Sequence, residues 1–93
     1  MEPWYAPHVL NAVKQIEEDP ARGALWDAIC DVIELICDHP DSAEARREQV
    51  RTAQGVLRQV PVRCYVEDDD WVVLWRPAGE IAEIHYIGSR MFR

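Results

Sequence analysis

The sequence predicts a single α+β domain in which an N-terminal helical hairpin packs on a three- to four-stranded antiparallel sheet. A chain of 93 residues is long enough for one hydrophobic core and too short for two, so residues 1–93 are assigned to one domain. Apolar side chains recur at helical spacing in the first half and alternate, as in strands, in the last third. Helices that precede a run of strands are typical of an α+β architecture.

The helical hairpin is expected between residues 7 and 39. Pro7 suits the first turn of a helix, and Pro20 ends that helix because it disfavours helical geometry at Asp19. The second helix, from Ala21 to about His39, has two neighbouring apolar rows and an acidic outer face. The rows are Leu25, Ile29, Val32 and Ile36, then Trp26, Cys30, Ile33 and Cys37, and the acids are Asp27, Asp31, Glu34 and Asp38.

The segment after this hairpin fits two interpretations. Asp41 followed by Glu44 could cap a helix, whereas residues 49–52 alternate weakly, as in a short edge strand. The alternation favours the strand, and the sequence leaves open whether residues 46–54 are helix or strand.

The last third changes to the period of a strand. Its expected strands are Val60–Val66, Trp71–Trp75 and Ile81–Ile87. The first places Arg63 opposite its apolar face, and the second is apolar on both faces, which is typical of a central strand. Turns are expected at the acidic residues 67–70 and around Pro77 and Gly79, and Gly88 is expected to end the last strand.

The charge is unevenly distributed between the two halves of the chain. Residues 1–44 hold ten acids against two basic residues, whereas residues 45–93 hold eight arginines and seven acids. Arginine presents a planar fork that suits phosphate or carboxylate. The three cysteines fit no metal-ligand spacing, so neither a metal nor another cofactor is expected. No apolar stretch approaches the ~18 residues of a membrane span, and a cytoplasmic location is expected.

The order of these elements resembles that of the RelE/ParE superfamily, the toxins of bacterial type II toxin–antitoxin systems. The similarity covers roughly Val9–Arg90, and it is strongest over the arginine-bearing strand, the aromatic strand and the closing strand that ends in IG-x-R. It implies a growth-inhibiting toxin held inactive by a cognate antitoxin protein. RelE-like members act as mRNA interferases in the ribosomal A site without a metal, ParE-like members poison DNA gyrase, and some members do neither detectably.

The resemblance carries over to particular positions only in part. Arg63 and Arg90 stand where the family has basic residues, before the first turn and after the closing glycine. The arginine that commonly opens the next strand of RelE-like members is Val72 here, and the chain stops at Arg93 without the usual C-terminal tyrosine or histidine. The usual first strand is also weak, since MEPWYAP is short and has two prolines.

Metal-free cleavage of RNA needs a base, an acid and positive charge near the phosphate. The expected catalytic residues are Arg63, His85, Tyr86 and Arg90, and the expected RNA- or partner-binding residues are Arg51, Arg58, Arg76 and Arg93. Histidine can transfer protons near neutral pH, tyrosine can donate a proton or stack on a base, and Glu83 could orient His85. Because His85 and Tyr86 are adjacent on a strand, they are expected to point to opposite faces.

The first functional expectation is therefore a ribosome-associated mRNA endoribonuclease of the RelE type. The alternative is a binding-only protein, either a ParE-like gyrase poison or a catalytically silent member of the superfamily. The absence of the strand arginine and of the C-terminal extension favours the alternative. The net charge of −7 opposes an approach to RNA, so either the arginine face alone suffices or the target is a protein.

Overall fold

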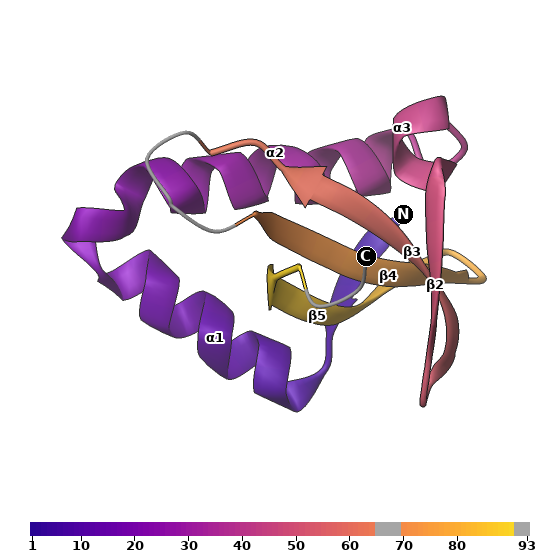
Figure 1. Cartoon of the computed structure of the whole chain (residues 1–93), viewed down its shortest axis with the longest axis horizontal. Helices are drawn as coiled ribbons and strands as arrows, with labels where there is room; N and C mark the ends of the chain where they lie inside the picture. Colours follow the sequence, from indigo (N-terminus) through magenta and orange to yellow (C-terminus); the bar gives the residue numbers. More distant parts are fainter. Residues whose placement is uncertain (65–69, 91–93) are drawn as a thin grey trace.

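The computed structural model of the chain describes residues 1–64 and 70–90, which form an α+β fold with a five-stranded mixed sheet (Figure 1). The helical elements are α1 (Pro7–Glu18), the 3₁₀ turn η1 (Pro20–Arg22), α2 (Gly23–Asp38) and α3 (Ala43–Arg46). The strands are β1 (Glu2–Tyr5), β2 (Glu48–Thr52), β3 (Gly55–Val62), β4 (Trp71–Ala78) and β5 (Ile81–Ser89), in the sheet order β1-β5-β4-β3-β2. None of the described helices is long and apolar enough to cross a membrane.

The predicted helical hairpin is confirmed. α1 has Pro7 in its first turn and ends at Glu18, ahead of Pro20. The Asp19 carboxylate accepts a hydrogen bond from the Ala21 amide at 2.9 Å, and this contact caps the short turn that leads into α2. The chain reverses here, so the two helices form the two arms of the hairpin (Figure 1).

The predicted sheet is wrong in strand number and in direction. Five strands are present instead of three or four, and β1 runs parallel to β5, with Glu2 opposite Ile81 and Tyr5 opposite Ile84. β1 has only four residues, one of them Pro3, and its partner lies at the other end of the sequence. Local alternation therefore carries almost no signal for this strand.

The ambiguous segment contains both a helix and a strand. Ser42 caps α3 by accepting a hydrogen bond from the Ala45 amide at 3.3 Å, and β2 then follows, as the alternation favours. β3 begins at Gly55, whose φ of 101° suits glycine, and it ends at Val62. Arg63 therefore follows the strand, contrary to the prediction. Of the predicted turn at residues 67–70, all but Asp70 lie outside the described residues.

The sheet buries apolar side chains on both of its faces. One face packs against α1 and α2 and includes Val73, Trp75 and Ile84, which are fully buried. The other, which we call the outer face, carries a smaller cluster of Leu57, Val72 and Leu74. β4 lies at the centre of the sheet and contributes to both clusters, which confirms the prediction of a central strand.

The pairing of β4 with β5 contains a bulge. Leu74 lies opposite Tyr86, whereas its neighbour Trp75 lies opposite Ile84, so His85 is an extra residue on β5. A bulge of this kind breaks the strict alternation of a strand and redirects the side chains beside it.

Candidate functional site

The bulge places His85 and Tyr86 on the same face of the sheet. Tyr86 packs on the outer-face cluster. Arg76 lies two residues after Leu74 on β4, so both belong to the outer face, and Glu83 lies opposite Arg76 on β5. His85 contacts Glu83 and therefore lies on the outer face as well. The expectation that adjacent residues point to opposite faces is wrong here, because it assumes an uninterrupted strand.

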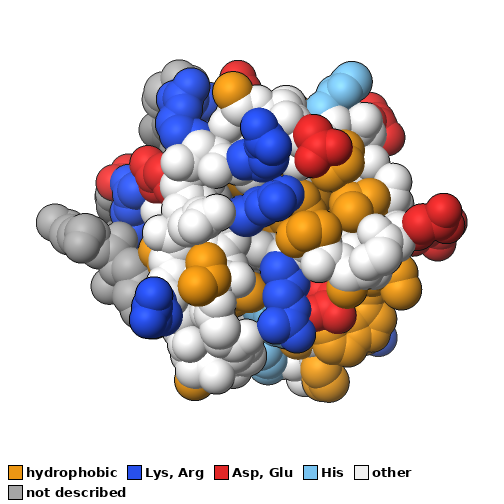
Figure 2. All heavy atoms as spheres, turned by 90° about the vertical axis from the view of Figure 1, so that its right-hand side faces the viewer, with side chains coloured by type: hydrophobic (Ala, Val, Ile, Leu, Met, Phe, Trp, Pro, Cys, Tyr) orange, Lys and Arg blue, Asp and Glu red, His pale blue; other side chains and the backbone are white. Residues whose placement is uncertain are grey.

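The outer face is hollowed into a cavity of 530 Å³ beside these two residues, and we call it the outer-face cleft. Leu57 and Leu74 of the sheet line it, together with the β2–β3 turn. Its polar lining includes His8, Arg51, Gln54, His85 and Tyr86. Figure 2 views the side of the molecule on which the β2–β3 hairpin lies, and basic side chains gather across it.

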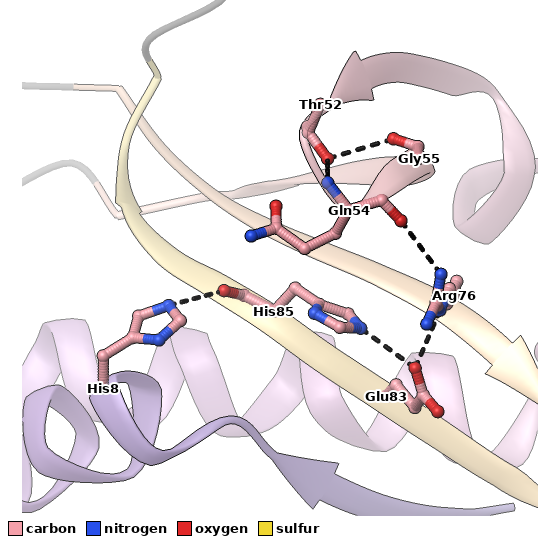
Figure 3. A network of polar contacts seen from close by, with 7 residues as sticks. All are labelled: His8, Thr52, Gln54, Gly55, Arg76, Glu83 and His85. Carbon is pink, nitrogen blue, oxygen red and sulfur yellow. Dashed lines mark hydrogen bonds and ion pairs between the residues drawn. The ribbon is translucent and has the colours of Figure 1, made fainter.

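A short polar network fixes His85 in the cleft (Figure 3). The Oε1 atom of Glu83 lies 3.0 Å from Nε2 of His85 and accepts a hydrogen bond from Nε of Arg76 at 2.7 Å. Hydrogen bonds lower the pKa of Glu83 below its ordinary value, and the bond from His85 has a larger effect than the bond from Arg76. An ionised carboxylate can only accept hydrogen bonds, so Nε2 of His85 is the protonated nitrogen and the donor to Glu83. Nδ1 of His85 is then the unprotonated nitrogen, which can accept a proton.

Arg76 also ties this network to the β2–β3 turn. Its Nη1 atom donates to the backbone oxygen of Gln54 at 3.0 Å, and the Gln54 amide donates to the Thr52 hydroxyl at 3.1 Å (Figure 3). The turn that lines one side of the cleft is thus held at a fixed place relative to His85.

His8 is a cleft residue that the sequence did not indicate. The pairing of β1 with β5 ends where Tyr5 lies opposite Ile84. Three residues after Tyr5, Nε2 of His8 lies 2.8 Å from the backbone oxygen of His85, the residue that follows Ile84. A carbonyl only accepts, so Nε2 of His8 is the donor. The two histidines are 77 positions apart, and no pattern in the sequence relates them.

Tyr86 forms a fixed part of the cleft lining. Its hydroxyl donates to the Ser89 carbonyl at 2.7 Å, and burial raises its pKa, so the phenol stays protonated at neutral pH. Its ring lies against Gly88, where a Cβ would be 2.6 Å from the hydroxyl oxygen. Gly88 is therefore required by the close approach of Tyr86, and its own backbone needs no positive φ.

Of the predicted arginines, Arg51 lines the cleft, whereas Arg76 does not line it and is paired with Glu83, which contacts the cleft residue His85. Arg51 is exposed and forms no ion pair with any residue that the structure describes. Arg58 instead lies over the Trp75 ring, with its guanidinium carbon 5.0 Å from the ring centroid. Arg93 lies outside the described residues.

Arg63 and Arg90 do not line the cleft. Nη2 of Arg90 donates to Oε2 of Glu48 at 2.7 Å, and the same oxygen accepts from Nε2 of Gln59. Arg63 lines a separate cavity of 290 Å³ between α2 and the end of β3. Pro61, which also lines this cavity, lies beyond Gln59, the last β3 residue that pairs with β2. Its missing N–H therefore removes no hydrogen bond to β2, and it makes the free edge of β3 less able to pair with another strand.

The cleft therefore combines groups that can accept a proton, donate a proton and hold an anion, in the form of His85, Tyr86 and Arg51. Within residues 1–64 and 70–90, no three histidine, cysteine or acidic side chains are placed to hold a metal ion. No protein-family model, curated protein or solved structure matches the chain.

Proposed function

We propose that the chain is the toxin of a bacterial toxin–antitoxin pair and a ribosome-associated mRNA endoribonuclease of the RelE type, acting in the cytoplasm. The observation that carries the proposal is the bulge at His85, which places His85 and Tyr86 together in a cleft that Arg51 also lines. The order of the elements, with β1 ahead of the helical hairpin, also supports the resemblance to this superfamily.

In this proposal His85 is the general base. Its Nδ1 atom takes the proton of the ribose 2′-hydroxyl as that oxygen bonds to the adjacent phosphorus, while Glu83 keeps Nε2 protonated and the ring in place. Glu83 is thus a positioning residue. Its lowered pKa keeps it ionised over the pH range in which a histidine can exchange protons.

The charged phosphate is held by Arg51, the arginine of the cleft without an ion-pair partner in the described chain. The P–O5′ bond then breaks, and the protonated phenol of Tyr86, released from the Ser89 carbonyl, donates its proton to the leaving 5′ oxygen. Arg63 and Arg90 have no catalytic part in this arrangement, because Arg63 lines another cavity and Arg90 is paired with Glu48. A cognate antitoxin would silence the site by covering the cleft.

The experiment adds purified protein to a translation reaction and maps the 5′ ends of message fragments. Cleavage should appear at ribosome-bound codons and fall ~10²–10⁴-fold in His85→Gln, the range typical of general acid–base catalysis. Arg63→Gln is the matched control, since this residue lies in the other cavity and should retain cleavage. Intact message with folded wild-type protein would reject the nuclease proposal.

A second candidate is a binding-only protein, either a gyrase poison or a silent member of the superfamily. Val72 is buried in the outer-face cluster, so an apolar side chain occupies the position of the family's strand arginine. Arg58, Arg76 and Arg90 all contact groups within the chain. Inhibition of gyrase supercoiling without any cut in translated message would favour this candidate.

A further inference from the structure

A second apolar groove lies away from the outer face, between the two long helices and β1. It is a cavity of 340 Å³ with a mostly apolar lining. Tyr5 of β1 and Val13 of α1 contribute to it, and α2 contributes Trp26, Cys30, Ile33 and Cys37. We call it the helix groove, and the proposed nuclease site uses none of these residues.

The helix groove exposes an apolar row that the sequence pattern would place in the core. The neighbouring row of α2, which includes Leu25, Ile29 and Ile36, is buried against the sheet. In contrast, Trp26 and Ile33 are only half-buried and Cys30 is exposed. The row runs along one side of α2, and Trp26, Ile33 and Cys37 pack against the core with only part of their surface. Contiguous apolar surface of this kind, rimmed by charge, typically marks an interaction site.

Acidic side chains lie along the helix groove, chiefly on α2. Glu34 and Asp38 of α2 line it. The pKa of the Cys30 thiol is raised, mainly by partial desolvation and to a smaller extent by the negative charges of Asp27, Asp31 and Glu17. Glu17 belongs to α1, so negative charge reaches Cys30 from both sides of the groove.

We propose that the helix groove binds a basic amphipathic helix of a partner protein. The α2 row from Trp26 to Cys37 extends about 16 Å at 1.5 Å per residue, which matches three turns of an incoming helix with anchors at i, i+3 or i+4, and i+7. Lysine and arginine flanking those anchors complement the acids of α1 and α2. A second copy of the chain would bring like charge against like charge, because residues 1–44 hold ten acids and two basic residues.

A synthetic helix of about 14 residues, with leucine anchors and lysine elsewhere, is a direct probe of the groove. Its binding is measured by the fluorescence anisotropy of a dye on the peptide, and a leucine–glutamate peptide with the same anchors is the control. In parallel, alkylation of each cysteine is followed by mass spectrometry. The basic peptide should bind and slow alkylation of Cys30 about tenfold, while Cys64, which does not line the groove, should react at an unchanged rate.

Two charge variants separate groove binding from general attraction to an acidic protein. Glu34→Gln with Asp38→Asn should weaken the basic peptide about tenfold, since two partly screened ion pairs are lost. Asp41→Asn with Glu44→Gln removes the same charge outside the groove and should leave binding unchanged. Equal weakening in both variants, or full reactivity of Cys30 in the presence of bound peptide, would overturn the proposal.

Discussion

Substituting Gly88 with alanine tests the packing that shapes the outer-face cleft. The Tyr86 ring lies so close to Gly88 that an added Cβ would be 2.6 Å from the hydroxyl oxygen and 2.8 Å from the ring carbon that bears it. Gly88 is buried, and the ring packs on the outer-face cluster, so the clash must displace Tyr86. We therefore expect Gly88→Ala to destabilise the protein and to deform the cleft.

The expected loss has two sources. Overpacking a well-packed site typically costs about 1–3 kcal/mol, and loss of the hydrogen bond from Tyr86 to Ser89 adds about 1 kcal/mol. The free energy of unfolding should thus fall by about 2–4 kcal/mol. For a domain of this size each kcal/mol corresponds to about 4–8 °C in Tm, so Tm should fall by roughly 10 °C or more.

Urea unfolding of a double-mutant cycle isolates the contact. Tyr86→Leu removes the atoms that would clash and keeps an apolar side chain on the outer-face cluster. In that background Gly88→Ala should cost less than about 0.5 kcal/mol, which gives a coupling energy of about 2 kcal/mol. An equal cost of Gly88→Ala in both backgrounds would show that the Tyr86 ring is not what Gly88 accommodates.

Gly23→Ala is the matched control for a glycine without such a contact. Gly23 has φ −57° and ψ −41°, and a Cβ there would have nothing within 4 Å. Because alanine favours helical backbone more than glycine does, this variant should gain about 0.5–1 kcal/mol in the same urea assay.

Three further substitutions have expected outcomes in equilibrium unfolding. Because the pKa of Glu83 is lowered in the folded protein, its contribution to stability is present above about pH 4.5 and is lost as the pH falls through the folded pKa. In urea unfolding at several pH values, Glu83→Gln should lack this loss of stability at low pH. Glu48→Ala leaves Arg90 and Gln59 without their carboxylate and should reduce the free energy of unfolding by about 1–2 kcal/mol in urea, whereas an unchanged midpoint would show that these contacts contribute nothing. Gly79→Ala forces alanine to a φ of 63° and should lower Tm by several degrees in calorimetry, since this backbone costs about 1 kcal/mol; an unchanged Tm would contradict that reason.

The helices and the last two strands could be predicted because their signals are local. The apolar residues of α1 and α2 recur at helical spacing, and Pro20 separates the two helices. β4 and β5 coincide with apolar runs that turn residues bound. β1 could not be predicted in the same way. Its four residues become a strand only by pairing with β5, and an edge strand that contains Pro3 has no distinguishing pattern.

The arrangement of the candidate site depended on one feature that was present in the sequence but weak. The apolar residues Ala82, Ile84 and Ile87 of β5 face the helices, and the spacing changes from two to three after Ile84. That change marks the bulge at His85 and the shared face of His85 and Tyr86. In contrast, the separation of Arg63 from His85 follows from tertiary packing, because β3 ends before Arg63 and this residue faces α2 across another cavity.

Cleavage of ribosome-bound message by purified protein tests the central proposal most directly. Wild-type protein is expected to cut translated message, and His85→Gln, with an unchanged Tm, is expected to lose this activity at least about a hundredfold. Intact message with the folded wild-type protein, or equal cleavage by wild type and His85→Gln, would contradict the account.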